Sequence, residues 1–142
     1  MTRVDFYRLE TGETHQAACL VTAKAYQAGY RLRLYAGDEA NLAELDSRLW
    51  TFRQNAFVPH ARREVVDEDF PEPVVLATDC LTPEGASVLV CAAPPPPECL
   101  EHYERVAEFV PADPEYRQAA RRRYAHYREA GHELHAHAIR AN

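Results

Sequence analysis

The chain has 142 residues, 46% of them hydrophobic, and a formal net charge of −6. This composition predicts one folded domain with a packed core and excludes a disordered chain. The negative charge excludes a protein that coats nucleic acid with its whole surface, and no apolar run approaches the roughly 20 residues of a membrane span.

The first half of the chain alternates between strand and helix patterns. Side chains that alternate in polarity indicate strands, whereas apolar residues three and four positions apart indicate helices. Thr14 and Asp38 are expected to cap the helices, because their side-chain oxygens accept hydrogen bonds from unpaired backbone N–H groups. The predicted elements are a strand over 3–9, a helix over 14–28, a strand over 31–35 and a helix from 38 to about 50, followed by an irregular segment over 52–69.

The second half contains short strands and one long helix. The run 87–93 is apolar throughout, which is typical of a central strand buried on both faces. Asp113 or Pro114 is expected to begin the final helix, and past Gly131 the chain is expected to continue as an exposed polar tail. The predicted elements are a strand over 74–78, a turn over 82–85, a strand over 87–93, a polyproline corner over 94–97, a short helix over 98–103, a strand over 105–110 and a helix over 113–131.

This alternation predicts an α/β fold with a mainly parallel sheet. Such folds often bind nucleotides at the carboxyl ends of their strands. The first strand-to-helix turn, 9–14, lacks both glycine-rich phosphate motifs and carries Glu10 and Glu13 where a phosphate needs positive charge. A nucleotide-binding protein or an enzyme of unknown substrate is therefore the alternative function. Direct binding of single-stranded DNA conflicts with the net charge and the absence of aromatic residues interleaved along a basic groove.

The four cysteines, Cys19, Cys80, Cys91 and Cys99, form no CxxC pair. They are expected to be reduced, mostly buried thiols of a cytoplasmic protein, without a structural disulfide. A nucleophile pair of His60 with Cys80 or Cys99 lacks any local feature that would lower the pKa of the thiol.

A histidine-rich segment follows the final helix. His132, Glu133, His135 and His137 do not have HExxH spacing, and their offsets do not place three ligands on one helical face. The sequence therefore predicts a solvent-exposed polar tail with no metal and no cofactor, and a metal site in a loop past Gly131 is the alternative.

The final helix carries the most distinctive pattern. Arg117, Arg121, Tyr124 and Arg128 are separated by offsets of 4, 7 and 11, which places three guanidinium groups and one ring on a single stripe. The segment 115–142 has six Arg against three Asp or Glu, so a basic region stands on an acidic body. This stripe suits a ligand that is both anionic and partly apolar.

The competing interpretation is that these arginines only form a solvated helix face, which is common. Arg122 and Arg123 are expected to do only that, and Tyr127 is expected to pack in the core.

Five local sequences occur in a fixed order along nearly the whole chain. They are Val4-Asp5-Phe6-Tyr7, Leu45-Asp46 with Leu49-Trp50, Phe57-Val58-Pro59-His60, Phe109-Val110-Pro111, and Arg121 with Tyr124, Tyr127-Arg128 and Gly131. Together they resemble the chi subunit of bacterial DNA polymerase III holoenzyme, an accessory of the clamp loader.

The resemblance implies a Rossmann-like three-layer fold and a non-catalytic adaptor in DNA replication. Chi proteins bind the acidic C-terminal tail of single-stranded DNA-binding protein, which ends in Pro-Phe, and the psi subunit of the clamp loader. Some also bind an accessory helicase through the psi surface. The resemblance implies no specific binding of nucleic acid, no membrane partner and a cytoplasmic location.

The family's tail-binding positions fall at Val110, Arg117, Arg121 and Tyr124. The chain departs from the family at Ala125, where a chi protein can carry a basic residue. Arg128, Arg122 or Arg123 are the residues expected to supply that charge.

For psi, the resemblance implies an aromatic patch of Trp50, Phe57, Val58, Pro59 and His60. The alternative is that Trp50 and Phe57 close the core beneath their loop.

Overall fold

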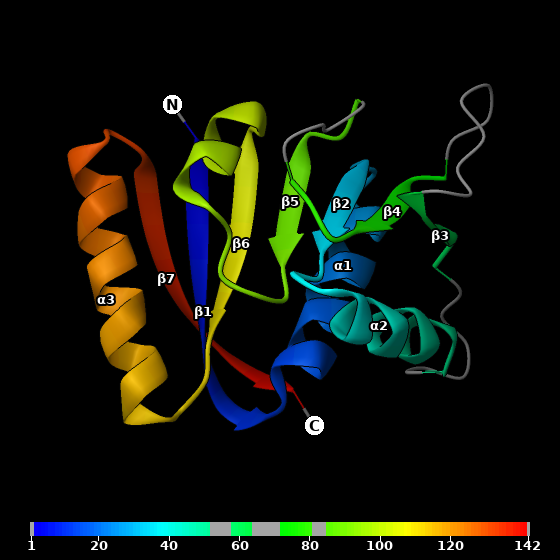
Figure 1. Cartoon of the computed structure of the whole chain (residues 1–142), viewed down its shortest axis with the longest axis horizontal. Coiled ribbons are helices and arrows are strands. Elements are labelled where there is room, and N and C mark those ends of the chain that lie inside the picture. Colours follow the sequence, from blue (N-terminus) through cyan, green and yellow to red (C-terminus); the bar gives the residue numbers. More distant parts are fainter. Residues whose placement is uncertain (1, 52–57, 64–71, 81–84, 142) are drawn as a thin grey trace.

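All strands in the described part of the chain lie in one parallel sheet (Figure 1). The computed structural model describes residues 2–51, 58–63, 72–80 and 85–141. Its seven strands have the order β3-β4-β2-β5-β6-β1-β7. The predicted α/β class with a mainly parallel sheet is confirmed. The elements are β1 (Arg3–Gly12), α1 (Thr14–Gln27), β2 (Leu32–Tyr35), α2 (Glu39–Thr51), β3 (His60–Arg62), β4 (Val74–Ala77), β5 (Val88–Cys91), the 3₁₀ helix η2 (Pro97–His102), β6 (Arg105–Val110), α3 (Pro114–Glu129) and β7 (Glu133–Ala141).

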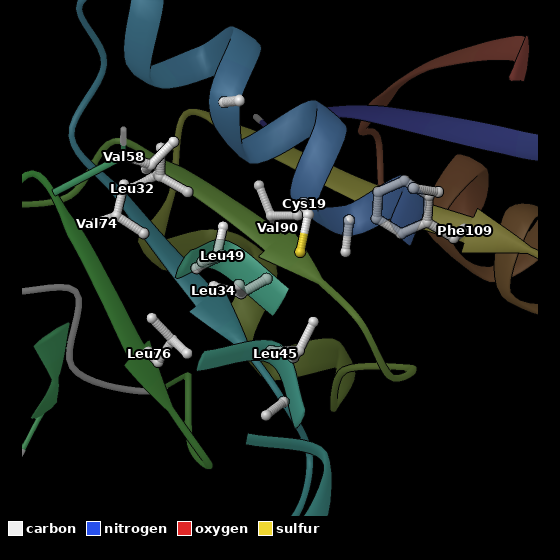
Figure 2. Packing of buried hydrophobic residues seen from close by; sticks show 14 of the residues in the cluster. Cys19, Leu32, Leu34, Leu45, Leu49, Val58, Val74, Leu76, Val90 and Phe109 are labelled. Carbon is white, nitrogen blue, oxygen red and sulfur yellow. The ribbon is translucent and has the colours of Figure 1, made fainter. Parts of the chain in front are cut away.

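Two apolar clusters, one on each face of the sheet, make the three layers. Helices α1 and α2 pack on one face, where Leu45 and Leu49 of α2 meet Leu34 of β2 (Figure 2). Helices η2 and α3 pack on the other face, where Leu100 and Tyr127 are buried. Strand β5 shows why its apolar run is continuous: successive residues contribute alternately to the two clusters.

Of the two caps predicted from the sequence, Asp38 is confirmed and Thr14 is not, and the final helix begins at Pro114, one of its two predicted starts, with Asp113 as its N-cap. Asp38 accepts a hydrogen bond from the Asn41 backbone N–H at 2.8 Å, and Asp113 accepts one from Glu115 at 2.9 Å. The predicted Thr14 cap is wrong, because Glu13 occupies the N-cap position without a side-chain cap. Strand β1 continues to Gly12 along β7, so the helix begins at Thr14, and the Glu13 carboxylate pairs with Arg48 at 2.6 Å.

The exposed polar tail predicted after Gly131 is wrong, because Glu133–Ala141 forms the edge strand β7. It pairs in parallel with β1 from Arg3–Glu133 to Gly12–Ala141. The segment expected to be irregular likewise contains a short strand, β3, where it is described.

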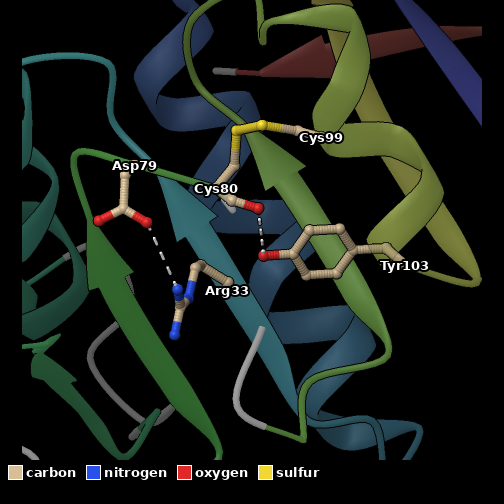
Figure 3. Close-up of a disulfide and its surroundings, with 5 residues drawn as sticks. All are labelled: Arg33, Asp79, Cys80, Cys99 and Tyr103. Atoms are coloured by element: carbon tan, nitrogen blue, oxygen red, sulfur yellow. Dashed lines mark hydrogen bonds and ion pairs between the residues drawn. A yellow bond between two sulfur atoms is a disulfide. The ribbon is translucent and has the colours of Figure 1, made fainter. Parts of the chain in front are cut away.

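The expectation that all cysteines are reduced is wrong for two of the four. Cys80, after β4, and Cys99, in η2, form a disulfide with a Cα–Cα distance of 5.6 Å (Figure 3). They are 19 residues apart, and the sheet topology brings them together. Cys19 and Cys91 are buried free thiols as expected, and burial raises the pKa of Cys19 to about 12.

Candidate functional site

The arginine stripe of α3 faces a pocket of about 520 Å³ between that helix and strands β1, β6 and β7. Its lining residues are Phe6, Arg8, Val110, Arg117, Ala120, Arg121, Tyr124, Ala136, His137 and Ala138. The structure thus brings four of the five residues predicted for tail binding into one pocket. The fifth, Arg128, is not among the lining residues, but its guanidinium carbon lies 5.6 Å from the centroid of the Tyr124 ring.

The strands form the floor of this pocket. Phe6 and Arg8 are two residues apart in β1, so their side chains emerge on the same face of the sheet. Phe6 is aligned with Ala136 of β7, and Arg8 is aligned with Ala138 of β7 and Val110 of β6. Because alanine side chains are short, these two positions of β7 leave the space beneath α3 open.

Aromatic rings form one part of the wall. The ring centroids of Phe6 and Tyr124 are 5.5 Å apart and tilted by 51°. Phe6 also lies 6.0 Å from Tyr127, which is only 1% exposed and therefore packs in the core as predicted. Tyr124 is half-buried, so part of its ring remains accessible from the pocket. An apolar ligand group can pack against this surface.

The charged groups of the pocket wall are cations. Among the described residues, no carboxylate lies within ion-pair distance of Arg8, Arg117 or Arg121, and no Asp or Glu is among the lining residues. The Arg117 Nε atom is buried and has no hydrogen-bond partner among the residues that the structure describes. Guanidinium groups pair well with carboxylates, often through two parallel hydrogen bonds. The arrangement can therefore hold an anionic ligand that also carries an apolar group.

The neighbouring arginines of α3 have different surroundings. Arg122 is exposed, as expected for a solvated position. The same expectation is wrong for Arg123, which donates to the buried Glu108 carboxylate at 2.8 Å. Burial raises the pKa of Glu108, and the Arg123 charge opposes that rise. Ala125 is exposed and is not among the pocket residues.

Sequence reasoning missed the pocket residues contributed by strands β1 and β7 and one small residue of the helix, which are Phe6, Arg8, Ala120, Ala136, His137 and Ala138. The contact between β1 and α3 is tertiary, and β7 was not recognised as a strand. The one local signal is that Arg8 stands two residues after Phe6 on a predicted strand, and so on the same face.

The residues predicted for psi binding differ in how far they are exposed. Trp50 is 59% exposed, and its ring centroid lies 4.7 Å from that of His60. His60 is buried, with Nδ1 at 2.7 Å from the Val58 carbonyl oxygen and Nε2 at 3.0 Å from Asp46. Val58 is buried and Pro59 is half-buried, whereas Phe57 lies outside the described residues. Of the described members, Trp50 therefore presents the largest accessible surface.

A smaller pocket, of about 340 Å³, lies at the carboxyl ends of β5 and β6, where a nucleotide would be expected. The Arg123 guanidinium in its wall is paired with Glu108, which is also a wall residue. This charge balance offers little attraction to a phosphate.

The histidines of β7 form pairs with acids. His135 lies 2.9 Å from Glu133, and His137 lies 2.8 Å from Asp5. Within the described ranges, no group of three or more His, Cys, Asp or Glu side chains is arranged to hold a metal ion. No helix in this part of the chain combines the length and apolar character needed to cross a bilayer.

Comparison with known proteins gives matches along nearly the whole chain. Residues 1–135 match the family described as DNA polymerase III chi subunit, HolC. The chain is 37% identical over 142 residues to DNA polymerase III subunit chi of Pseudomonas aeruginosa, a match that covers 98% of each protein. It is 25% identical over 141 residues to the subunit of the same name in Escherichia coli, covering 94% of this chain and 96% of that protein.

Proposed function

The chain belongs to the family of DNA polymerase III chi subunits, and on that premise we propose that it is a non-catalytic adaptor that binds the acidic C-terminal tail of single-stranded DNA-binding protein (SSB). The observation that carries the proposal is the pocket beneath α3, where Arg117 and Arg121 stand beside the Tyr124 ring. A tail that ends in Pro-Phe has carboxylates for the arginines and a ring for the apolar wall. Such an adaptor acts in the cytoplasm during DNA replication, without specific contacts to DNA.

One tail in such an open pocket binds weakly, because each exposed ion pair adds at most about 1 kcal/mol. An SSB assembly carries several tails, and an adaptor held on the clamp loader presents its pocket to them repeatedly. The effective concentration of tails then raises the overall affinity without any additional contact.

The direct test is fluorescence anisotropy of a labelled SSB-tail peptide titrated with this protein at low and moderate salt. We expect binding that weakens with salt, because exposed charges are screened, and that is largely lost when the terminal Phe is removed. Arg121→Ala should weaken binding about fivefold, as expected for the loss of one exposed ion pair, and Tyr124→Ala about tenfold, as expected for a central contact of an interface.

Arg122→Ala is the matched control, because Arg122 lies on the same helix but outside the pocket. It should change the affinity less than twofold. Wild-type affinity in both pocket variants, with their fold intact by circular dichroism, would remove this pocket from the proposed function.

We propose further that the surface around Trp50 binds the psi subunit, and that an accessory helicase competes for the same surface. Trp50 is 59% exposed at the end of α2, and a large exposed aromatic side chain is a frequent anchor of protein interfaces. Its contact with the buried His60 ring fixes one side of the indole.

Trp50→Ala should weaken psi binding by more than tenfold in isothermal titration calorimetry, with little effect on the SSB-tail peptide. Tyr116→Ala is the matched control, because Tyr116 is 58% exposed but lies in α3. Equal losses of psi affinity in the two variants would argue against a specific surface at Trp50.

A further inference from the structure

The arginines of the pocket come from two different elements, the helix above it and a strand of its floor. Arg117 and Arg121 project from α3, whereas Arg8 projects from β1 beneath them. Arg8 is exposed, and no carboxylate of the described residues lies within ion-pair distance of it. Its positive charge is therefore directed to the pocket and to solvent.

The two ends of the pocket also differ in chemical character. Helix α3 runs antiparallel to β1, as Figure 1 shows. The contact between the Phe6 and Tyr124 rings fixes one level of the pocket, and Arg117 lies seven residues earlier on the helix. Seven helical residues span about 10 Å, and Arg8 is displaced from Phe6 in the same direction, toward the carboxyl end of β1. One end of the pocket is thus aromatic, and the other carries Arg8 and Arg117.

We infer that Arg8 is a third cation of the proposed tail site, that it binds acidic side chains upstream of the terminal aromatic residue, and that the peptide enters at the Arg8–Arg117 end and terminates at the Tyr124 end. This inference rests on the proposed function. A C-terminal aromatic residue carries its ring and its carboxylate on the same Cα atom. With the ring against Phe6 and Tyr124, the carboxylate lies beside Arg121, which is one helical turn from Tyr124.

The spacing of the two ends matches an extended peptide. Three extended residues span about 10 Å, so acidic side chains two to four positions before the C-terminus come level with Arg8 and Arg117. The opposite orientation would place the acids against rings and leave two guanidinium groups beside the apolar residue.

Arg8 also accounts for the departure of this chain at Ala125. None of Ala125, Arg122 and Arg128 is among the residues of the pocket, the Arg128 guanidinium lies over the Tyr124 ring, and Arg123 is engaged by Glu108. The positive charge that α3 lacks at Ala125 is therefore supplied by Arg8 of β1. Ala136 and Ala138 of β7 keep the path to it open.

The test is a set of double-mutant cycles measured by peptide anisotropy. The protein variants are Arg8→Gln, Arg121→Gln and, as the matched control, Arg122→Gln. The probes are the SSB-tail peptide, the same peptide with its aspartates replaced by asparagine, and the same peptide with a C-terminal amide. Thermal unfolding followed by circular dichroism checks that each variant is folded.

Arg8→Gln should weaken the binding of the parent peptide and of the amidated peptide about fivefold each. It should change the affinity for the asparagine peptide less than twofold. Arg121→Gln should instead weaken the binding of the parent peptide but not that of the amidated peptide, which has no terminal carboxylate for Arg121 to bind. Arg8→Lys should restore most of the affinity, because the effect is mainly one of charge.

If Arg8→Gln behaves like Arg122→Gln while Arg121→Gln weakens binding, Arg8 has no role and the proposed function stands. If Arg8 is coupled to the terminal carboxylate rather than to the aspartates, the orientation is the reverse of the one inferred. If the wild-type protein binds none of the peptides, both the proposed function and this inference are wrong.

Discussion

Asp5 is a buried carboxylate that joins three adjacent strands. It accepts hydrogen bonds from Arg3 of β1 at 3.2 Å and from Arg105 of β6 at 3.1 Å, and it lies 2.8 Å from His137 Nε2 of β7. Burial alone raises the pKa of Asp5, but the hydrogen bonds with His137, Arg105 and Arg3 outweigh burial, and the pKa lies below its ordinary value. The ionised form of Asp5 therefore stabilises the β6-β1-β7 part of the sheet.

Asp5→Asn should lower the free energy of unfolding by about 3 kcal/mol at neutral pH, because it removes the acceptor charge from a buried network. A lowered native pKa gives stability that is present above the unfolded pKa, about 3.9, and is lost as the pH falls through the native pKa. The difference between wild type and variant should therefore shrink below about pH 4. Urea unfolding at several pH values measures it, and a difference that stays constant down to pH 2 would contradict the role of Asp5 ionisation.

At the scale of elements, β7 decides the shape of the pocket and of the sheet edge. Its alanines on the α3 side leave the pocket open, and its other face places His137 against the Tyr7 ring at a centroid distance of 5.0 Å. The far end of β7 lies against β1 at Gly12, which has a φ of 89°. A Cβ atom at Gly12 would overlap the carbonyl oxygen of Ala141.

Gly12→Ala should therefore destabilise the protein more than Gly131→Ala, whose φ is 88° but whose Cβ would meet open space. Both variants bear the cost of left-handed backbone, about 1–2 kcal/mol. Gly12→Ala adds a steric cost of about 1–3 kcal/mol. Thermal unfolding of the two variants side by side gives the comparison, and equal losses would show that the end of β7 is easily displaced.

The elements that the sequence predicts well are those whose local signals are strong. The apolar run of β5, the Asp38 cap, the start of α3 at Pro114 and the 3.6-residue spacing of α3 each have one dominant cause. Strand β7 was missed because most of the apolar members of its alternating pattern are alanines, which have low strand propensity, so its local signal was weak. Its existence depends on pairing with β1, about 130 residues earlier.

The candidate site shows the same division. Val110, Arg117, Arg121 and Tyr124 could be identified from the helix stripe and the family resemblance, and they line one pocket. Whether Arg8 lies in the pocket depends on how α3 packs across the sheet, and no local sequence pattern specifies that packing. The Cys80–Cys99 disulfide was missed for a related reason, since a spacing of 19 residues does not indicate which loops meet.

At the scale of the whole molecule, the disulfide ties the two halves of the sheet together. Cys80 follows β4, on one side of β5, whereas η2 precedes β6 on the other side. Figure 3 shows the bond above the Tyr103 ring, whose hydroxyl donates to the Cys80 carbonyl oxygen at 3.1 Å. The crosslink thus connects segments that the β2–β5 and β5–β6 pairings also hold together.

Cys80→Ser combined with Cys99→Ser should lower the free energy of unfolding by about 3 kcal/mol, the loop-entropy value for a closed loop of this length. Neither cysteine is among the residues of the α3 pocket, so affinity for the SSB-tail peptide should change less than twofold. Urea unfolding with and without a reductant measures the effect. The reductant should destabilise the wild type but not the double variant, and no effect on either would show that the bond contributes little.

The sheet order also constrains how the protein is made. Strand β1 leaves the ribosome before the other described strands of the sheet, but its two neighbours, β6 and β7, are the last two of those strands in sequence order. The nascent chain must therefore hold Val4 and Phe6 without their native partners until residues 105–141 have emerged. Contacts between residues so far apart in sequence form late and slowly. This half of the sheet consequently folds only after residues 105–141 have been made, and the pocket beneath α3 forms with it.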